Sequence, residues 1–306
     1  MKLRIAISLS LSASILPFAA CVSSGPPELE TAVAELEASW CTAHKLDAFS
    51  SDADEGRLVF TPDGRTAYFH RFVDGRQVIL ESRRTGSGWS TPAPVPFATP
   101  FDEFDAFVTP DGRTLYYTSF RSLDGASAQT HGDIWKVTRT AAGWGAPVRL
   151  GPEVNTDANE FFPSTTADGT LFFNSDREGG AGAWDLWRAR RNGSGFRTAE
   201  NLPGGVNTDI WEFNPSPSPG GRLLAFGSLD PDPAAPYSDI FFAVKVGGAY
   251  SERVPAPYCV NGEGEEYHPT LDVAGGRLIF VRRDPFHPVT GGDFYEVRLP
   301  GAFWRD

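Results

Sequence analysis

The chain has 306 residues, of which 41% are hydrophobic, and a formal net charge of −12, which is typical of a folded soluble protein and excludes a disordered one. The acidic balance makes nucleic acid and anionic membranes poor partners for this surface. With 32 glycines, 25 prolines and one methionine, the composition favours many short strands joined by tight turns over long helices.

Residues 1–20 predict an export signal, because a basic start precedes an apolar run that ends in small residues. The run is too short to span a membrane. Since Ala20 leads directly into Cys21, the segment resembles a bacterial lipoprotein signal, in which that cysteine is lipidated and becomes the mature N-terminus. The alternative is an ordinary secretory signal cleaved near Ala20. Residues 21–37 would follow as a short tether with room for a helical turn, and the lipid would be the only contact with a membrane.

Five segments along the rest of the chain resemble one another. Two of them read "NTDANEFFPSTTADGTLFFNSDR" and "NTDIWEFNPSPSPGGRLLAFGS". Each segment has a glutamate followed nine residues later by a glycine, and successive glutamates lie 48, 57, 52 and 54 residues apart. Self-similarity at this period is typical of a propeller or a solenoid. The five glutamates are Glu55, Glu103, Glu160, Glu212 and Glu266.

Each repeat divides into four strands. The first begins at the glutamate, a turn that is Asp-Gly in three units leads to a second apolar run such as "LFF", and motifs such as "WDLWRA" mark the third strand. Asp-Gly between apolar runs is a strong hairpin signal, because glycine accepts the positive φ of such turns. The sequence therefore predicts an all-β fold, a five-bladed β-propeller of four-stranded antiparallel blades, over residues 38–306. The last unit stops where its fourth strand should begin, so we expect residues 38–55 to supply that strand and close the ring.

The repeated pattern is E-[FY]-x-P, a D-G turn, L-[YF]-[YF], S-x-R and D-[IL]-[WF]. It resembles the TolB-like, WD-type β-propeller repeat of bacterial envelope proteins, over nearly all of the chain from about residue 38. The unit that begins at Glu160 matches best. The unit that begins at Glu55 departs from the pattern, with Gly56 in place of the aromatic residue. The resemblance implies a propeller in the cell envelope, but it says little about function because one scaffold serves unrelated roles.

The strand directions place the connecting loops on two faces. The Asp-Gly turns lie on one, which we call the turn face. The crossovers that lead into each glutamate, and the loops between second and third strands, lie on the other, which we call the crossover face. The crossover-face loops are long and irregular, as in "SLDGASAQTHG". Such loops on a rigid scaffold usually carry binding, so we expect this face to be functional, with contacts at His131, Tyr237 and Phe286.

The glutamates and the residues two positions after them should share one side of the first strand and line the central channel. Five converging carboxylates could attract a hard cation such as calcium. The alternative, which we favour, is that each glutamate accepts backbone N–H bonds from a crossover and locks blade to blade. Arg57 and Asp105 could simply pair, and His268 could be a base, a metal ligand or a hydrogen-bonded channel residue. The candidate ligand-binding residues are Arg57, Glu103, Asp105, Glu160, Glu212, Asn214, Glu266 and His268.

The repeat argues against a bond between Cys41 and Cys259, although an oxidising compartment would favour one. It places Cys41 at the turn-face start of an outer strand and Cys259 in a crossover on the opposite face. A five-residue strand spans roughly 17 Å, which is beyond the reach of a disulfide. We therefore expect the two cysteines to be unpaired.

Two functions from different classes fit these observations. The first, which the resemblance supports, is a non-enzymatic binding or scaffolding module of the cell envelope, monomeric and without a cofactor, that engages an envelope protein or a glycan. The second is a carbohydrate-active enzyme, a glycosidase or lyase, because five-bladed propellers also host glycosidases. Its acid and base would come from Glu212, Glu266 and Asp105, with His268 assisting. No catalytic motif is present, neither a G-x-S-x-G elbow nor H-E-x-x-H.

Overall fold

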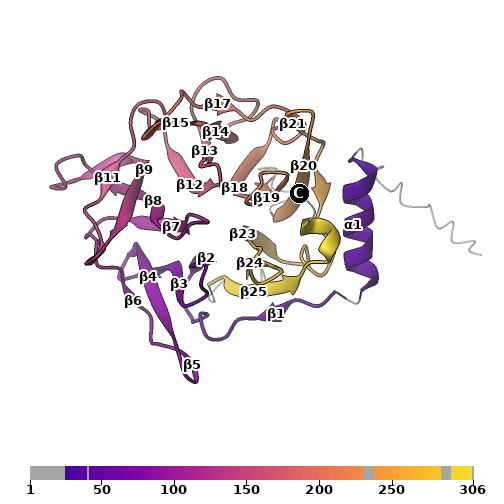
Figure 1. Cartoon of the computed structure of the whole chain (residues 1–306), viewed down its shortest axis with the longest axis horizontal. Helices are drawn as coiled ribbons and strands as arrows, with labels where there is room; N and C mark the ends of the chain where they lie inside the picture. Colours follow the sequence, from indigo (N-terminus) through magenta and orange to yellow (C-terminus); the bar gives the residue numbers. More distant parts are fainter. Residues whose placement is uncertain (1–24, 40, 230–236, 284–290, 305–306) are drawn as a thin grey trace, which may run out of the picture.

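The computed structural model describes residues 25–39, 41–229, 237–283 and 291–304, and these form a five-bladed β-propeller (Figure 1). The blades are antiparallel sheets around a central axis, so the predicted fold is confirmed. The predicted signal in residues 1–20, the lipidation site Cys21 and the predicted contact Phe286 lie outside the described residues. No described helix is both long and apolar enough to cross a membrane.

Each blade has three longer strands and a short outer strand. The first blade contains β2 (Glu55–Phe60), β3 (Thr66–Val73), β4 (Arg76–Thr85) and β6 (Ala93–Pro94). The second contains β7 (Glu103–Val108), β8 (Thr114–Arg121), β9 (Ala128–Thr140) and β11 (Val148–Arg149). The third contains β12 (Glu160–Thr165), β13 (Leu171–Ser175), β14 (Asp185–Ala189) and β17 (Glu200–Asn201). The fourth contains β18 (Trp211–Pro217), β19 (Leu223–Leu229), β20 (Ser238–Val246) and β22 (Val254–Pro255). Small hairpins at the outer edges add β5 (Gly88–Trp89), β10 (Gly143–Trp144), β15 (Arg191–Asn192), β16 (Gly195–Phe196) and β21 (Ala249–Tyr250).

The fifth blade joins the two ends of the chain. It contains β23 (Glu265–Asp272), β24 (Arg277–Arg283), β25 (Asp293–Arg298) and the N-terminal strand β1 (His44–Lys45), in which Lys45 lies opposite Tyr295. The Lys45 ammonium also donates a hydrogen bond of 2.7 Å to the Asp293 carboxylate. The predicted closure by an N-terminal strand is therefore confirmed, and β1 covers part of the outer edge of β25.

Hydrophobic side chains fill the seams between neighbouring blades. Between the first and second blades, for example, Val59 and Tyr68 pack with Leu115 and Tyr117 in one buried cluster. Alternation along each strand produces this arrangement, since inner strands are covered by a blade on either side and are apolar on both faces. The structural core is thus a set of seams around the axis.

Asparagines in three crossovers bind the third strand of the blade that precedes each crossover. Asn155 accepts a hydrogen bond from the Ile134 backbone N–H (2.8 Å) and donates to the Ile134 carbonyl (3.0 Å). Asn207 makes the same pair of bonds with Leu186, and Asn261 makes it with Ile240. This accounts for the asparagine in the repeated "VN" dipeptides, because its side-chain oxygen accepts a hydrogen bond from a third-strand N–H, whereas the carbonyl of the same third-strand residue also accepts one from the segment of the outer strand, as Ile134 does from Leu150 (3.0 Å).

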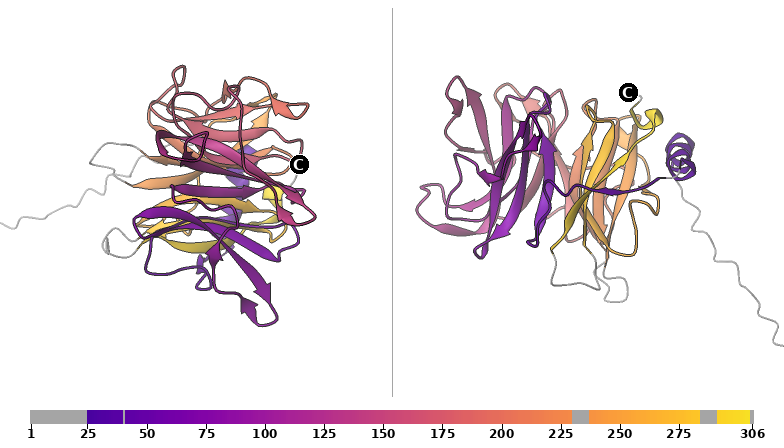
Figure 2. Two further views of the ribbon diagram at one scale, coloured as in Figure 1. Left: turned by 90° about the vertical axis from the view of Figure 1, so that its left-hand side faces the viewer. Right: turned by 90° about the horizontal axis from the view of Figure 1, so that it is seen from below.

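Helix α1 (Pro27–Ala38) packs on the outer side of the last two blades (Figures 1 and 2). It begins after Pro26, and proline at the first helical position is favoured because no N–H partner is lost. Its buried residues recur at helical spacing and contact Val244 and Phe303; they are Leu29, Ala32, Val33 and Leu36. The segment is therefore a packed helix of 12 residues, longer than the helical turn that the sequence analysis expected in a tether.

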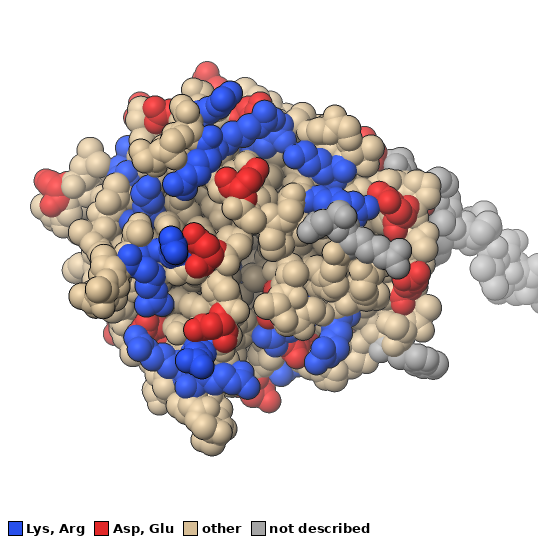
Figure 3. Space-filling model, in the orientation of Figure 1, with Lys and Arg blue, Asp and Glu red and all other residues tan. Residues whose placement is uncertain are grey.

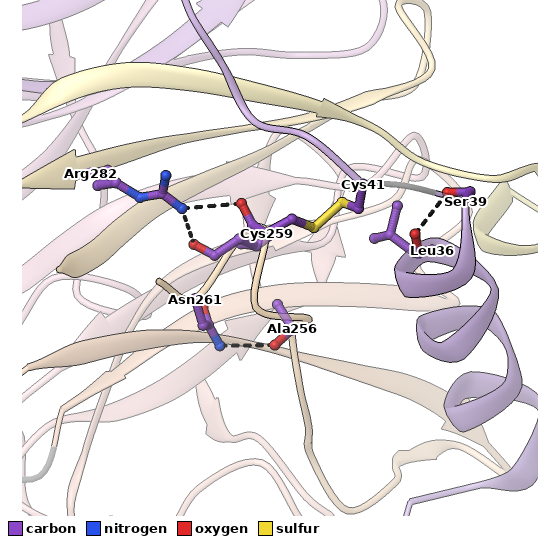
Figure 4. Close-up of a disulfide and its surroundings, with 8 residues drawn as sticks. Leu36, Ser39, Cys41, Ala256, Cys259, Asn261 and Arg282 are labelled. Carbon is purple, nitrogen blue, oxygen red and sulfur yellow. Dashed lines mark hydrogen bonds between the residues drawn. A yellow bond between two sulfur atoms is a disulfide. The ribbon is translucent and has the colours of Figure 1, made fainter. Parts of the chain in front are cut away.

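Cys41 and Cys259 form a disulfide with a Cα–Cα distance of 5.7 Å (Figure 4). The expectation that they stay unpaired is wrong, because it assumed that Cys41 begins a five-residue strand. Strand β1 has only two residues and starts at His44, and the chain before it runs to the crossover that holds Cys259. Arg282 fixes that crossover by donating to the carbonyls of Cys259 (3.1 Å) and Val260 (2.8 Å).

Candidate functional site

The repeated glutamates lie at the crossover-face ends of the inner strands and bind the crossovers. Glu160 accepts hydrogen bonds from the Thr156 backbone N–H (2.9 Å) and from Arg177 (2.8 Å). Glu212 repeats this pattern with Thr208 (3.0 Å) and Arg253 (3.0 Å). The other three glutamates have related partners. Glu55 accepts from Ser51 and Arg71, and Glu103 accepts from Thr99 and Ser119. Glu266 accepts from Arg282. All five are buried.

Burial dominates the electrostatics of these glutamates. It raises the pKa of Glu55 to about 7, although Ser51 and Arg71 act in the opposite direction. Burial also raises the pKa of the other four, while their hydrogen bonds and, for most of them, nearby arginines lower it. Each glutamate has at least one oxygen bound by a crossover, hydroxyl or arginine donor, although Glu55 Oε2 and Glu266 Oε2 have no partner among the described residues. This geometry favours a structural role over cation binding or catalysis.

The residues two positions after the glutamates share an unusual backbone conformation. All five have positive φ, between 42° and 57°, and the pairing of the first two strands shifts register at each of them. A β-bulge of this kind re-aims a side chain, and here it allows these five side chains to gather near the axis. They are Arg57, Asp105, Phe162, Asn214 and His268.

Three of these positions, with one further histidine, form a buried polar cluster that we call the axial cluster. His268 Nδ1 lies 3.0 Å from Asn214 Nδ2 and 3.3 Å from Asp105 Oδ1. His70, on β3, places its Nδ1 3.4 Å from the same Asp105 oxygen and accepts a hydrogen bond from the Asp105 backbone N–H (3.2 Å). The structure therefore brings Asp105, Asn214 and His268 together as candidates, and adds His70.

Arg57 lies in the same part of the channel but does not form an ion pair with Asp105. Its Nη2 donates to the Pro215 carbonyl (3.2 Å), and its guanidinium stacks over the Phe107 ring at 5.4 Å. Both oxygens of Asp105 lack a hydrogen-bond partner among the described residues. The direct pairing that the sequence suggested for Arg57 and Asp105 is therefore not formed.

The charges of the axial cluster are set by its burial. Burial lowers the pKa of His70 to about 3, with Arg57 acting in the same direction and Asp54 against it. Burial, His70 and Arg57 together hold the pKa of His268 well below its usual value. Burial raises the pKa of Asp105 well above its usual value, and the positive charge of Arg57 offsets part of this rise. Burial also lowers the pKa of Arg57 itself to about 10. Both imidazoles are therefore neutral at neutral pH.

His70 escaped the sequence analysis because it lies outside the repeated motif. It is opposite Gly56, and a Cβ on Gly56 would lie 2.2 Å from the His70 ring and 2.9 Å from His268 Nε2. The missing side chain thus leaves the space that the two imidazoles occupy. The sequence feature that could have identified His70 is the departure of the first unit from the repeat, with Gly56 at the position of the aromatic residue and a histidine opposite it.

Exposed apolar side chains are concentrated on the crossover face. Of the seven large hydrophobic residues that are exposed in the described chain, four lie there: Phe72, Leu123, Tyr237 and Tyr258. Leu123 and Tyr258 are the most exposed, at 75% and 70%. Tyr237 lies at the surface, whereas His131 is half-buried in β9.

Charge is distributed unevenly between the two faces. Figure 3 shows the turn face, where arginine and lysine surround the rim and acidic residues lie closer to the axis. Strand ends place Arg84, Arg139 and Lys245 on this rim. On the crossover face several arginines are paired with carboxylates, as Arg177 is with Glu160 and Arg253 is with Glu212.

A cavity of about 900 Å³ lies beside the disulfide, between the segment that links α1 to β1 and the crossover that leads into β23. Tyr258 and Glu263 line it from the crossover, Glu37 from the helix, and Arg283 and Tyr295 from the last blade. It shares no residue with the axial cluster. Two separate candidate sites therefore lie among the described residues, one closed on the axis and one open at the crossover face.

No protein-family model and no curated protein matches the chain. Among solved structures it is similar to a putative TolB from Agrobacterium tumefaciens, with 22% identity over 68% of this chain and 66% of that one (TM-score 0.47). TolB from Acinetobacter baumannii is 16% identical over 82% of this chain and 55% of its own (TM-score 0.46). An alpha-L-arabinofuranosidase from Lactobacillus brevis is 11% identical over 83% of this chain and 92% of its own (TM-score 0.52). The chain thus spans two thirds or less of both TolB structures.

At these identities the similarity shows the fold alone. The fold and the closed ring define the chain as a five-bladed β-propeller protein. Because propellers with unrelated activities share this architecture, function has to be argued from the two sites.

Proposed function

We propose that the chain is an exported β-propeller, anchored by a lipid at Cys21, that acts as a non-enzymatic binding module of the cell envelope. Its partner is a protein that docks on the crossover face. The observation that carries this proposal is that four of the seven exposed large hydrophobic residues of the described chain, Phe72, Leu123, Tyr237 and Tyr258, lie on loops or strand ends of that face. Exposed apolar side chains that cluster on one surface and are rimmed by polar groups are typical of protein interfaces.

Two features support export. The N-terminal segment has the build of a lipoprotein signal. The disulfide between Cys41 and Cys259 belongs to an oxidising compartment such as the periplasm or the cell surface, since disulfides are rare in the cytosol.

The cavity beside the disulfide gives the partner a recessed site. Tyr258 stands at its edge as an aromatic anchor, and Glu263 and Arg283 offer charges of both signs. Aromatic residues and arginine are enriched at the positions that dominate binding energy. We therefore place the centre of the interface at Tyr258.

The glycosidase alternative is less well supported. Two carboxyl groups must face the substrate at roughly 5–9 Å, one of them as an acid. Glu212 and Glu266 are engaged by Arg253 and Arg282, which leaves Asp105 as the single carboxylate of the axial cluster. Within the part of the chain that the structure describes, the axial cluster therefore does not by itself supply the pair of carboxyl groups that this chemistry needs.

The proposal is tested by site-specific photo-cross-linking in cells that produce the full-length chain. A photoreactive residue at Leu123 or Tyr258 should give one discrete cross-linked species, and one at Val246, an exposed residue on the turn face, should not. The species is identified by mass spectrometry, and the purified partner is then titrated against the wild type and the Leu123→Ser and Tyr258→Ser variants. We expect the dissociation constant to rise at least tenfold in one of them.

Equal cross-linking from Val246 and Tyr258, or unchanged affinity in both variants, would exclude the crossover face as the interface. Release of sugar from glycan pools by the purified chain, abolished by Asp105→Asn, would instead establish the enzymatic alternative.

A further inference from the structure

The axial cluster contains more hydrogen-bond acceptors than donors. Asp105 Oδ1 lies 3.4 Å from His70 Nδ1 and 3.3 Å from His268 Nδ1, and suitable ligand atoms of the three residues all lie within 4.8 Å of one another. All three side chains are buried, and Asp105 is completely so. Three electron-pair donors therefore converge where water has little access.

The hydrogen bonds around the cluster show that neither Nδ1 carries a proton. The Asp105 backbone N–H donates to His70 Nδ1. The orientation of the Asn214 amide is fixed because its Oδ1 accepts from the His268 backbone N–H (3.3 Å), so its NH₂ group faces His268 Nδ1. Both imidazole nitrogens that face the carboxylate are thus acceptors, and Asp105 Oδ1 and Oδ2 have no donor. A buried carboxylate without a partner is costly, and a cation held between these atoms would compensate it.

The glutamates recur in all five blades, whereas the axial cluster depends on residues that differ from the repeated pattern. In the other blades an aromatic residue follows the glutamate, and the residues opposite it are Thr118, Asn174, Gly227 and Val281. Only the first blade has glycine there with histidine opposite, and Gly56 gives the two rings their space. A feature that every blade needs for its architecture would recur in every blade, so this exchange points to a ligand.

We propose that His70, Asp105 and His268 bind one divalent transition-metal ion, of the zinc class, on the propeller axis. Tetrahedral zinc with bonds of about 2.0–2.1 Å separates its ligand atoms by roughly 3.3–3.4 Å, which is the separation of Asp105 Oδ1 from each Nδ1. Two imidazoles and one carboxylate favour zinc, nickel or cobalt over calcium or magnesium. Metal binding would replace the two hydrogen bonds at Nδ1. The positive charge of Arg57 opposes a bare dication, so we expect an anion or hydroxide as the fourth ligand.

This metal would connect three blades that are separated along the sequence. His70 belongs to the first blade, Asp105 to the second and His268 to the fifth. The bound ion would therefore hold the seam where the ring closes, and removing it should lower the thermal stability of the chain. This inference is independent of the partner proposed for the crossover face.

The test uses the purified full-length chain, stripped with a chelator and then titrated with Zn²⁺ by calorimetry and with Co²⁺ by visible absorption. We expect one ion per chain, a tetrahedral Co²⁺ spectrum and a higher melting temperature with Zn²⁺. Asp105→Asn and His70→Gln should each weaken binding by at least about a hundredfold, because loss of an outer-shell partner alone costs 10–100-fold. His44→Gln and His131→Gln, which change histidines outside the cluster, should bind as the wild type does.

Failure of the folded wild type to bind Zn²⁺, Co²⁺ or Ni²⁺ would overturn the proposal, whether or not the variants fold. So would unchanged binding in Asp105→Asn or loss of binding in His131→Gln, which would indicate a surface site. A protonated Asp105 that donates to one imidazole would explain the same geometry without a metal. In that case Asp105→Asn should melt at the wild-type temperature, and Zn²⁺ should change neither melting curve.

Discussion

Gly56 and His70 lie opposite each other on β2 and β3, and the imidazole occupies the space that a side chain on the glycine would fill. In the other four blades the bulky ring belongs to the first strand; in the first blade it has moved to the second strand. This exchange turns one seam of a repetitive ring into a distinct polar centre.

Gly56→Ala should destabilise the fold, because its Cβ would lie 2.2 Å from the His70 ring. Overpacking of this kind typically costs about 1–3 kcal/mol. The free energy of unfolding in urea measures the effect. Gly86→Ala is the matched control, because a Cβ at Gly86 meets nothing within 4 Å and should leave stability unchanged or slightly raised. Equal stability of the two variants would show that the rings can move aside.

Glu160→Ala should be strongly destabilising if the repeated glutamates are structural. It leaves Arg177 and the Thr156 backbone N–H without their acceptor, and removing one partner of a buried ion pair costs about 3–5 kcal/mol. Glu178→Ala, an exposed carboxylate nearby, is the control. Chemical denaturation of both variants checks the prediction, and a stable Glu160→Ala protein that has lost a measurable activity would argue for a catalytic role instead.

Removing the disulfide should reduce stability without changing the fold. The bond joins residues 218 positions apart, and loss of a native disulfide costs about 2–5 kcal/mol. Cys41→Ser, Cys259→Ser and the reduced wild type should therefore unfold at the same, lower denaturant concentration. A single-cysteine variant that unfolds with the oxidised wild type would contradict the prediction.

Glu55 should contribute a fall in stability as pH rises from about 4.5 to about 7, whereas the buried imidazoles of His70 and His268, whose pKa values are lowered, act in the opposite direction over this range. Burial raises the pKa of Glu55 to about 7 in the folded state, so the folded chain binds this proton more tightly than the unfolded chain does. The favourable contribution is present at low pH and is lost as pH rises to 7, with an upper limit of about 3 kcal/mol. Urea unfolding at a series of pH values measures the slope. Glu55→Gln should remove the falling contribution, so that its stability relative to wild type increases as pH rises from about 4.5 to about 7, and Glu178→Gln should not. Identical profiles for Glu55→Gln and wild type would count against a raised pKa.

The sequence predicted the features that recur and missed those that occur once. The spacing of the glutamates and the Asp-Gly turns placed all five blades, and the missing strand of the last unit predicted the closure by residues 38–55, within which residues 44–45 form the strand. The disulfide was missed because the prediction assumed that Cys41 begins an outer strand of five residues, whereas β1 has two residues and begins at His44. His70 was missed because it is one strand away from the repeated motif, and contacts between strands depend on register.

The closing strand β1 is synthesised early but finds its partner strand, β25, only near the end of the chain. Lys45 lies 248 positions before its partner Asp293, so the segment synthesised early has no place to bind until the fifth blade exists. Until β1 pairs with it, β25 presents an unpaired edge, which invites pairing with other chains. A chain shortened at its C-terminal end would therefore also release its N-terminal end. The ring should behave as one cooperative unit, in which neither end is dispensable.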